Sequence, residues 1–328
     1  MKSGAKTITF ITVLLLVLAG GFFCFISWLT QSSQPTFGVT FSTVYAQNLG
    51  LDAKETYLAL LNDLKIRHFR LPVYWSEIEP KRGAFNWETM DFIVSEAEKN
   101  QAKLILAIGR KVPRWPECFI PDWAEGLTNS DAEEALLKME TAVVERYKNS
   151  SAVESWQVEN EPFFPFGVCP APSSSLFEKE LVLVRSLDQR PIMLTVSGEL
   201  DPWLDAARQA DVLGISMYRV SWNPVFGLFP YPVPALAYRF RSLVVAPFID
   251  KLVVSELQAE PWFTKSIDDL TGQERAAAFT ASDLKNNVNY VGLTGAKEVY
   301  LWGAEWWYVE KKMGRSELWK AAEELFKN

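Results

Sequence analysis

The chain has 328 residues, 48% of them hydrophobic and 22% charged, which is enough to build a large packed core. The formal net charge is −7 and there is no basic stripe, which argues against nucleic-acid binding. The chain has one histidine, His68, and three cysteines without a C-x-x-C spacing. This pattern argues against zinc sites and against any serine–histidine triad that does not use His68. We expect a monomer without a metal or an organic cofactor.

The N-terminus carries a long apolar run. Residues Ile8 to Leu29 are 22 consecutive uncharged, mostly apolar residues. As a helix they would span about 33 Å, enough for a bilayer core of about 30 Å. Lys2 and Lys6 precede the run, so the positive-inside rule places the N-terminus in the cytoplasm and the remaining chain outside. We therefore expect residues 1–30 to be an uncleaved, single-pass anchor in the cell membrane. A cleaved signal peptide and a secreted protein are the alternative.

Residues 31–35 form a short polar linker, after which strand-like runs alternate with helical patterns. Eight runs have the continuous apolar character of buried parallel strands: Thr36–Phe41, Ile66–Leu71, Lys103–Ile108, Val153–Val158, Ile192–Val196, Val212–Ser216, Lys251–Val254 and Glu298–Leu301. Helical patterns follow at Asp52–Lys65, Trp87–Asn100, Ser130–Lys148, Ser174–Leu187, Pro202–Ala210, Pro234–Val245, Gly272–Tyr290 and Arg315–Phe326. In the third helix, Ser130 and Glu133 form a capping-box pattern.

This alternation predicts an α/β fold, a (β/α)8 TIM barrel over residues 36–328. An open doubly wound sheet is the alternative, but no glycine-rich phosphate loop follows the first strand. In a barrel, the chemistry lies where the strands end and the βα loops begin. Glu161 follows the fourth predicted strand and Glu256 follows the seventh. These two strands face each other across the barrel mouth, an arrangement that suits glycoside hydrolysis by a pair of carboxyl groups.

Three sequence features together resemble a known clan of enzymes. They are Asn160-Glu161-Pro162 after an apolar strand, the stretch Tyr74–Pro80 (YWSEIEP) after the second strand, and the glutamate that ends the seventh strand. They resemble the retaining (β/α)8 glycosidases, which include cellulases, mannanases, xylanases and β-galactosidases. The resemblance extends from about Phe37 to the C-terminus. It implies that Glu161 is the general acid/base and Glu256 the nucleophile, with carboxyl groups about 5–5.5 Å apart.

The resemblance also implies supporting roles around this pair. Asn160 would hydrogen-bond the sugar 2-hydroxyl, and Arg70 would hold Glu256 ionised. Tyr218 would donate a hydrogen bond to Glu256. Trp302 would form the floor of the subsite where the bond breaks. Trp115, in the loop after the third strand, stacks a sugar in one interpretation and packs within its loop in the other.

Two glutamates compete with this assignment. Glu159 stands where the clan usually has an apolar or aromatic residue. Strand alternation places it on the same face as Glu161 unless the backbone bulges. Glu260 follows Glu256 by four residues, and we expect it in the loop. We also expect His68 to pack in the core, Glu199 to be a candidate for the cleft wall, and Trp306 or Trp307 to contact substrate.

The exported location permits a disulfide. Cys118 follows the third predicted strand and Cys169 the fourth, and loops after successive barrel strands are neighbours. We therefore expect these two cysteines to be bridged, with two buried free thiols as the alternative. Cys24 lies inside the apolar run and is no partner.

Together these observations predict a retaining hydrolase that cleaves O-glycosidic bonds of a β-linked oligo- or polysaccharide by double displacement. Two alternatives remain open: a transglycosylase that remodels surface polysaccharide, and a catalytically silent glycan-binding barrel. The membrane, through the N-terminal helix, would be the other partner, and no nucleic acid is expected.

Overall fold

The computed structural model describes residues 20–21, 32, 34–171, 173–223, 225, 227–263 and 267–327. Of the apolar run from Ile8 to Leu29, only Gly20 and Gly21 fall within these ranges, so the expected membrane anchor lies outside the described residues. None of the helices in the described ranges has the length and hydropathy needed to span a bilayer.

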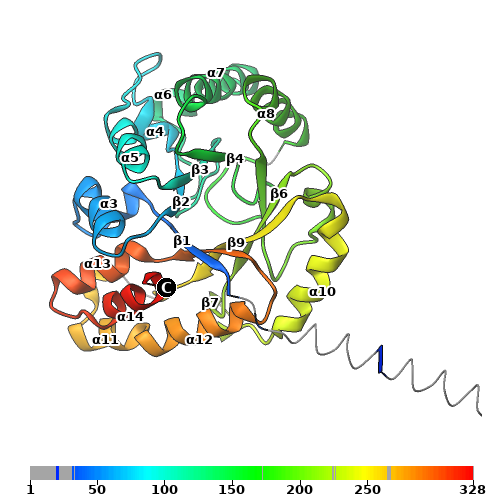
Figure 1. Ribbon diagram of the computed structural model, residues 1–328. Coiled ribbons are helices and arrows are strands. Elements are labelled where there is room, and N and C mark those ends of the chain that lie inside the picture. Colours follow the sequence, from blue (N-terminus) through cyan, green and yellow to red (C-terminus); the bar gives the residue numbers. More distant parts are fainter. Residues whose placement is uncertain are drawn as a thin grey trace, which may run out of the picture.

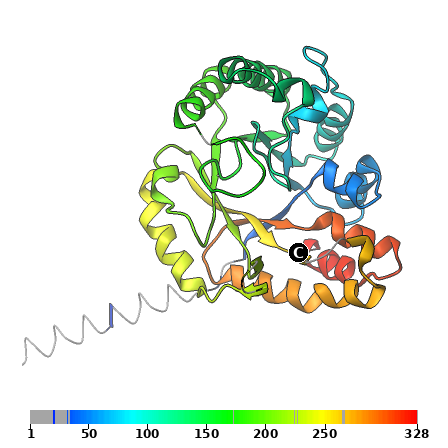
Figure 2. The same ribbon diagram turned by 180° about the vertical axis from the view of Figure 1, so that it is seen from behind.

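Eight parallel strands close into a barrel, and helices surround it on the outside (Figures 1 and 2). In order around the ring the strands are β1 Thr36–Thr40, β2 His68–Pro72, β3 Lys103–Ile108, β4 Val153–Val158, β5 Ile192–Val196, β6 Val212–Met217, β9 Lys251–Gln258 and β10 Glu298–Trp302. Each overlaps one of the eight predicted strands, so the (β/α)8 barrel is confirmed. The strands read as continuous apolar runs because helices cover one face and the barrel interior fills the other.

The helices between the strands are mostly those expected. They are α3 Ala53–Asn62, α5 Glu88–Lys99, α7 Asn129–Tyr147, α8 Ser174–Leu187, α9 Leu204–Ala207, α10 Ala235–Val245, α12 Ala281–Gly292 and α14 Glu317–Phe326. Shorter helices that the sequence did not predict are α2 Thr43–Asn48, α4 Trp75–Ile78, α6 Asp122–Glu125, α13 Ala304–Lys312, η1 Ala246–Phe248 and η2 Ile267–Asp269. Another short helix, α11 Gly272–Ala278, lies within the stretch predicted as Gly272–Tyr290.

Two of the predicted helices need correction. Helix α7 begins one residue earlier than expected, because Thr128 caps it by accepting a hydrogen bond from the Asp131 backbone N–H. The capping box at Ser130 was therefore wrong. The stretch predicted as one helix over residues 272–290 is two helices, since Phe279 is extended and Thr280 caps α12 through a capping box with Asp283.

One strand of the barrel is irregular where the site forms. Opposite β6, Ile215 pairs with Val254 but Ser216 pairs with Glu256, so β9 holds one extra residue at this point. The register against β10 shifts in the same place. A bulge of this kind redirects the side chains that follow it. Glu256 therefore lies within β9, which continues to Gln258 rather than ending at Val254 as predicted.

A small antiparallel hairpin lies in the segment after β6, where no strand was predicted. Its strands are β7 Val220–Asn223 and β8 Gly227–Pro230. The hairpin follows β6 directly, at the end of the barrel where β6 and β9 finish. Trp222 is 45% exposed and lines the cleft described below. The hairpin thus forms part of the cleft wall.

Candidate active site

A cleft of about 840 Å³ opens at the carboxyl ends of the barrel strands. The predicted site residues Trp115, Asn160, Glu161, Tyr218, Glu256 and Trp302 all line it, as do Glu199, the expected candidate for the cleft wall, and Glu260. Five residues without a predicted role line it as well: Tyr45, Arg114, Glu117, Ser216 and Trp262. Arg70 is fully buried beneath these residues. The barrel therefore brings the expected site residues together, because parallel strands present their carboxyl ends at one face.

Glu256 is held by a cation and a hydroxyl group. The Arg70 Nη1 lies 2.9 Å from Glu256 Oε1, and the Tyr218 hydroxyl donates to Oε2 at 2.9 Å. Arg70 reaches this position from β2, where it also donates to Gln157 at 2.7 Å. Both contacts favour a negative charge on Glu256, as a nucleophile requires. These are the partners that the resemblance implied for it.

Glu260, the competitor of Glu256, has a different environment. Its carboxylate pairs with Arg114, which also pairs with Glu305 at 3.2 Å. The Arg114 guanidinium lies 4.0 Å from the Trp302 ring centre and 3.8 Å from that of Tyr45. Glu260 therefore belongs to a charge cluster at one side of the cleft, apart from the partners of Glu256.

Glu161 lies in surroundings that favour its protonated form. It is 8% exposed, and the Ser216 hydroxyl donates to its Oε1 at 2.8 Å. Burial, followed by the negative charges of Glu256 and then Glu117, raises the pKa of Glu161 well above its ordinary value. A carboxyl group that keeps its proton near neutral pH can act as a general acid.

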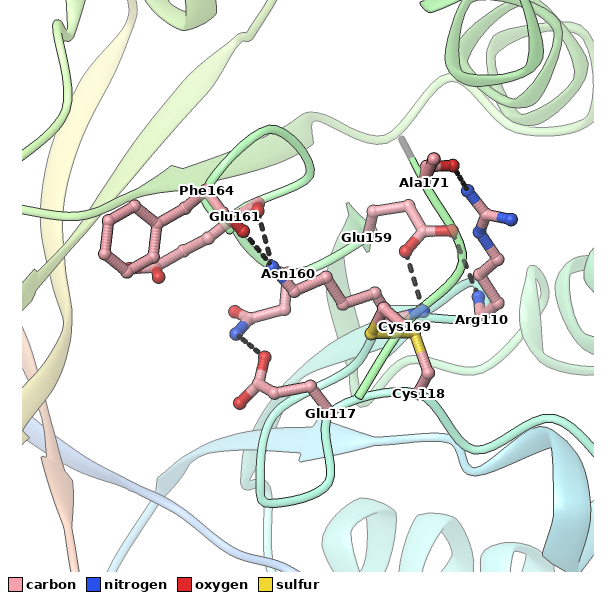
Figure 3. The surroundings of a disulfide bond; sticks show 10 residues. Arg110, Glu117, Cys118, Glu159, Asn160, Glu161, Phe164, Cys169 and Ala171 are labelled. Atoms are coloured by element: carbon pink, nitrogen blue, oxygen red, sulfur yellow. Dashed lines mark hydrogen bonds between the residues drawn. A yellow bond between two sulfur atoms is a disulfide. The ribbon is translucent and has the colours of Figure 1, made fainter. Parts of the chain in front are cut away.

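The backbone at the end of β4 explains why Glu159 does not share the cleft. Glu159 and Glu161 have φ values of 56° and 44°, so the chain leaves the strand conformation and the side-chain alternation fails. Glu159 extends away from Glu161 and accepts hydrogen bonds from the backbone N–H groups of Arg110 at 3.1 Å and Lys111 at 2.7 Å (Figure 3). Its carboxyl group is buried outside the cleft.

Glu159 belongs to a cluster of three buried carboxyl groups, with Glu140 from α7 and Glu180 from α8. Burial, followed by the charge of Glu159, raises the pKa of Glu140 to about 8. The native protein therefore holds a proton on Glu140 that the unfolded chain loses near its ordinary value of 4.5. Because the folded pKa is the higher one, stability falls as pH rises from about 4.5 through about 8.

Replacing Glu140 by glutamine should therefore stabilise the protein at alkaline pH. We expect the free energy of unfolding to rise by roughly 1–3 kcal/mol near pH 9, with a much smaller change near pH 5. Urea unfolding at the two pH values measures the difference. The exposed Glu134 of the same helix, changed to glutamine, is the matched control and should show no such pH dependence. An equal effect of Glu140→Gln at both pH values would contradict this account.

Asn160 connects the two catalytic candidates to a residue that the sequence did not single out. Its Oδ1 accepts from Arg70 Nη2 at 2.7 Å, and its Nδ2 donates to Glu117 Oε2 at 3.0 Å (Figure 3). Glu117 is 5% exposed, in the loop between β3 and α6. Burial, followed by the charge of Glu256, raises the pKa of Glu117 to about 8. The only sequence signal for it was a carboxylate beside Cys118.

The tryptophans divide into cleft and core residues. Trp115 is 63% exposed at the rim of the cleft, while Trp302 is nearly buried against Arg114. Trp306 and Trp307 are fully buried in α13, so the expectation that one of them contacts substrate was wrong. They pack inward because α13 presents them to the core, and the Trp307 indole N–H donates to the Ala259 carbonyl.

His68 is the first residue of β2, at the end of the strand that lies away from the cleft. It is partly buried, as expected for a packing residue. Its Nδ1 is buried without a hydrogen-bond partner in the described part of the chain. In the same ranges, no group of three or more histidine, cysteine, aspartate or glutamate side chains is arranged to hold a metal ion.

Cys118 and Cys169 form a disulfide, as predicted, with Cα atoms 5.3 Å apart (Figure 3). The bond joins the loop that carries Glu117 to the loop that follows Glu161. It closes a stretch of 51 residues, for which the chain-entropy relation gives about 4 kcal/mol of stabilisation.

Replacing both cysteines, Cys118 and Cys169, by serine should lower the free energy of unfolding by roughly 2–4 kcal/mol. Guanidinium unfolding of the oxidised wild type and the double variant measures the loss. Reduced wild type is the control, because it should unfold at the same denaturant concentration as the variant. Identical curves for oxidised and reduced wild type would contradict the prediction.

The chain matches known proteins in its N-terminal half and over its fold. The cellulase family, glycosyl hydrolase family 5, matches residues 29–168, which include β1 to β4 and Glu161. A stretch of 89 residues is 33% identical to mannan endo-1,4-beta-mannosidase A of Hypocrea jecorina and covers 24% of this chain. The match spans only 20% of that mannosidase.

Solved structures share the fold over most of the chain. A GH5_18 protein from Bifidobacterium longum subsp. longum matches with a TM-score of 0.57 at 14% identity, over 82% of this chain and 70% of that one. An endo-beta-1,4-xylanase from Gloeophyllum trabeum matches with a TM-score of 0.54 at 18% identity, over 83% and 85%. A beta-galactosidase from Rahnella sp. R3 matches with a TM-score of 0.59 at 12% identity, over 91% and 56%. At these identities the structures establish the common fold alone.

The family match and the mannosidase stretch rest on sequence similarity and not on the fold alone. Both sequence matches are to glycoside hydrolases, and they support the resemblance to the retaining (β/α)8-barrel enzymes. Like the enzymes that it resembles, the chain has an asparagine–glutamate pair after β4 and a glutamate in β9. It differs from them at Glu159, which the positive φ values after β4 turn away from the cleft.

Proposed function

We propose that this protein hydrolyses an O-glycosidic bond of a β-linked glycan by double displacement. The observation that carries the proposal is the contrast between two carboxyl groups in one cleft. Glu256 is paired with Arg70 and accepts a hydrogen bond from Tyr218, whereas Glu161 is buried next to other carboxyl groups. One environment favours a negative charge and the other favours a bound proton, as a retaining glycosidase requires.

In the first step, a Glu256 oxygen attacks the anomeric carbon while Glu161 gives its proton to the leaving oxygen. The glycosidic bond breaks, and a covalent glycosyl-enzyme forms with Glu256. In the second step, the ionised Glu161 takes a proton from water, and the resulting oxygen attacks the same carbon. The bond to Glu256 breaks, and the sugar leaves with its original anomeric configuration.

Surrounding residues position this chemistry. Arg70 and Tyr218 stabilise the charge that returns to Glu256 in the second step. Asn160, whose Oδ1 is held by Arg70, places its amide group beside the sugar. Trp302 forms one wall of the cleft, and the exposed Trp115 offers a ring at the rim on which a more distant sugar can stack.

We further propose that the catalytic barrel acts on the extracytoplasmic side of the cell membrane, anchored by residues 1–30. The apolar run from Ile8 to Leu29 and the preceding lysines support this location. The disulfide between Cys118 and Cys169 supports it too, because disulfides persist in oxidising compartments. Release of the protein from membranes by detergent, but not by high salt, is the expected result.

Trapping of the glycosyl-enzyme tests the proposed reaction. An activated 2-deoxy-2-fluoro β-glycoside should add one sugar mass to the protein, on the peptide that contains Glu256. Proton NMR of the first product should show the β-anomer. An α-anomer would contradict the retaining mechanism. Failure of every glycoside to react while one glycan still binds would favour a silent binding barrel. Products longer than the substrate at high acceptor concentration would favour transglycosylation.

A further inference from the structure

Glu117 is a buried carboxyl group in the cleft that the double displacement leaves without a role. It lines the cleft on the side of Asn160, and only 5% of its surface is exposed. Its charge raises the pKa of Glu161, and the charge of Glu256 raises the pKa of Glu117. A third carboxyl group here is costly unless it serves the site.

The protein holds Glu117 in a fixed position. Its φ of 75° lies in the left-handed region, which a residue with a side chain adopts only under constraint. Its carbonyl accepts from the Val112 N–H at 2.8 Å, and its N–H donates to the Arg114 carbonyl at 2.6 Å. Cys118, the next residue, is fixed by the disulfide. A side chain at Gly167 would lie only 2.6 Å from the Glu117 Cβ, so the loop after β4 packs directly against it.

One oxygen of Glu117 is occupied and the other is free for a ligand. Oε2 accepts from Asn160 Nδ2 at 3.0 Å. Oε1 accepts no hydrogen bond from any residue that the structure describes, and it points away from Asn160 (Figure 3). The site therefore holds an unpaired acceptor on a buried, rigidly placed acid.

The nearest cations are already engaged elsewhere. Lys111 Nζ donates to the carbonyl oxygens of Glu161 at 2.9 Å and Phe164 at 2.8 Å. Arg70 pairs with Glu256, and Arg114 pairs with two other glutamates. Arg114 is also the one lysine or arginine among the residues lining the described cleft, against five glutamates. None of these three cations forms an ion pair with Glu117.

We propose that Glu117 makes the cleft selective for a glycan that carries a free amino group, which it binds as an ammonium–carboxylate pair. A ligand ammonium supplies both a cation beside the carboxylate and a donor for Oε1, whereas a neutral hydroxyl supplies only the donor. If Glu117 is protonated before binding, its O–H bond breaks and the proton joins the amine nitrogen, so the pair forms without another reactant. This inference rests on the proposed glycan substrate and names its class.

Changing the ligand tests the inference without altering the protein. Calorimetry of the full chain would compare a chitosan tetrasaccharide, its fully N-acetylated form and the neutral cellotetraose, at about pH 6 and physiological salt. At this pH the amino groups are protonated. We expect the chitosan form to bind about ten- to a hundredfold more tightly than both others, the range of a charge-assisted hydrogen bond. Equal or weaker binding of the chitosan form would overturn the inference.

Two variants separate Glu117 from the general attraction of an acidic protein for a polycation. Glu117→Gln keeps the shape and an acceptor oxygen but removes the charge, and it should abolish the preference for the chitosan form over the N-acetylated form and cellotetraose. Glu125→Gln removes the same charge at the exposed end of α6 and should leave the preference unchanged. A preference that survives Glu117→Gln would overturn the inference.

Because binding and hydrolysis are measured separately, the two proposals can fail independently. A lost preference in Glu117→Gln, together with absent hydrolysis, would support the amino-sugar site and contradict the proposed function. Hydrolysis of neutral glycans with no amino preference would do the reverse.

Discussion

Replacing Glu256 by alanine should lower kcat on aryl β-glycosides by about 10⁴-fold or more, because the change removes the group that forms the covalent bond. Replacing Glu161 by alanine should have an effect that depends on the leaving group. For substrates with poor leaving groups, which need the proton, the rate of glycosyl-enzyme formation should fall by about 10²–10⁴-fold. For activated aryl glycosides this rate should change little. Steady-state and burst kinetics on both kinds of substrate measure this contrast.

Azide separates the two roles further, since it attacks without needing a general base. In Glu161→Ala it should displace the sugar from Glu256 and give the β-glycosyl azide. In Glu256→Ala it should attack the substrate from the space that the carboxylate left and give the α-glycosyl azide. Glu260→Ala is the matched control, a cleft glutamate held by Arg114, and should form no azide product. NMR identifies the products, and the same anomer from both catalytic variants would refute the assignment.

The pH dependence of kcat/KM tests the general-acid role of Glu161 independently. Its pKa is raised by burial and by the neighbouring charges, and the first step needs its protonated form. The kcat/KM of the wild type should therefore fall as pH rises through that raised pKa. On activated substrates the Glu161→Ala variant should lack this alkaline fall, because no proton is then required.

The second large effect is expected at Arg70. Its guanidinium group contacts three side chains: it donates hydrogen bonds to Gln157 and Asn160 and pairs with Glu256. Arg70→Met leaves these acceptors buried without their donor, and it should cost about 3–5 kcal/mol of stability together with all measurable activity. Arg208→Met, which removes an exposed arginine on the outer surface, should change stability by no more than about 0.5 kcal/mol.

Arg70→Lys separates stability from catalysis. It keeps the positive charge, but an ammonium group cannot reproduce the planar set of donors. We expect a folded protein in which kcat falls by about 10²–10³-fold, the usual loss when one preorganised donor is removed. Thermal unfolding and kinetics measured on the same preparation distinguish the two effects. Full activity in Arg70→Lys would show that charge alone suffices.

The fold could be predicted because buried parallel strands have a recognisable sequence pattern, a continuous apolar run. β4 and β6, for example, lie where their apolar runs indicated. The limits of β9 could not be predicted, because its bulge depends on pairing with β6 and β10, and no local pattern encodes that pairing. The hairpin β7–β8 was missed for a related reason, since its residues also suit a proline-rich rim loop.

The central site residues could be predicted because they lie at or near the carboxyl ends of strands, which a closed barrel brings together, and because the sequence resembles the retaining glycosidases. Glu161 and Glu256 were assigned on that basis, and Arg70 and Tyr218 contact Glu256 as expected. Glu117 was missed because its place depends on a loop conformation and a disulfide. The orientation of Glu159 depended on two residues with positive φ, which alternation along a strand does not anticipate.

The closure of the barrel also bears on how the protein acquires activity during folding. β1 pairs with β10 along its whole length, and the pairing of Arg70 with Glu256 joins residues 186 positions apart. Contacts between such distant segments form late, because closing long loops costs entropy before the contacts repay it. A chain that has folded only through β4 contains Glu161 and Arg70 in place. It lacks the nucleophile Glu256, which is also the partner that balances the charge of Arg70. A partly folded intermediate should therefore be catalytically inert, with activity appearing only when the last strand completes the ring.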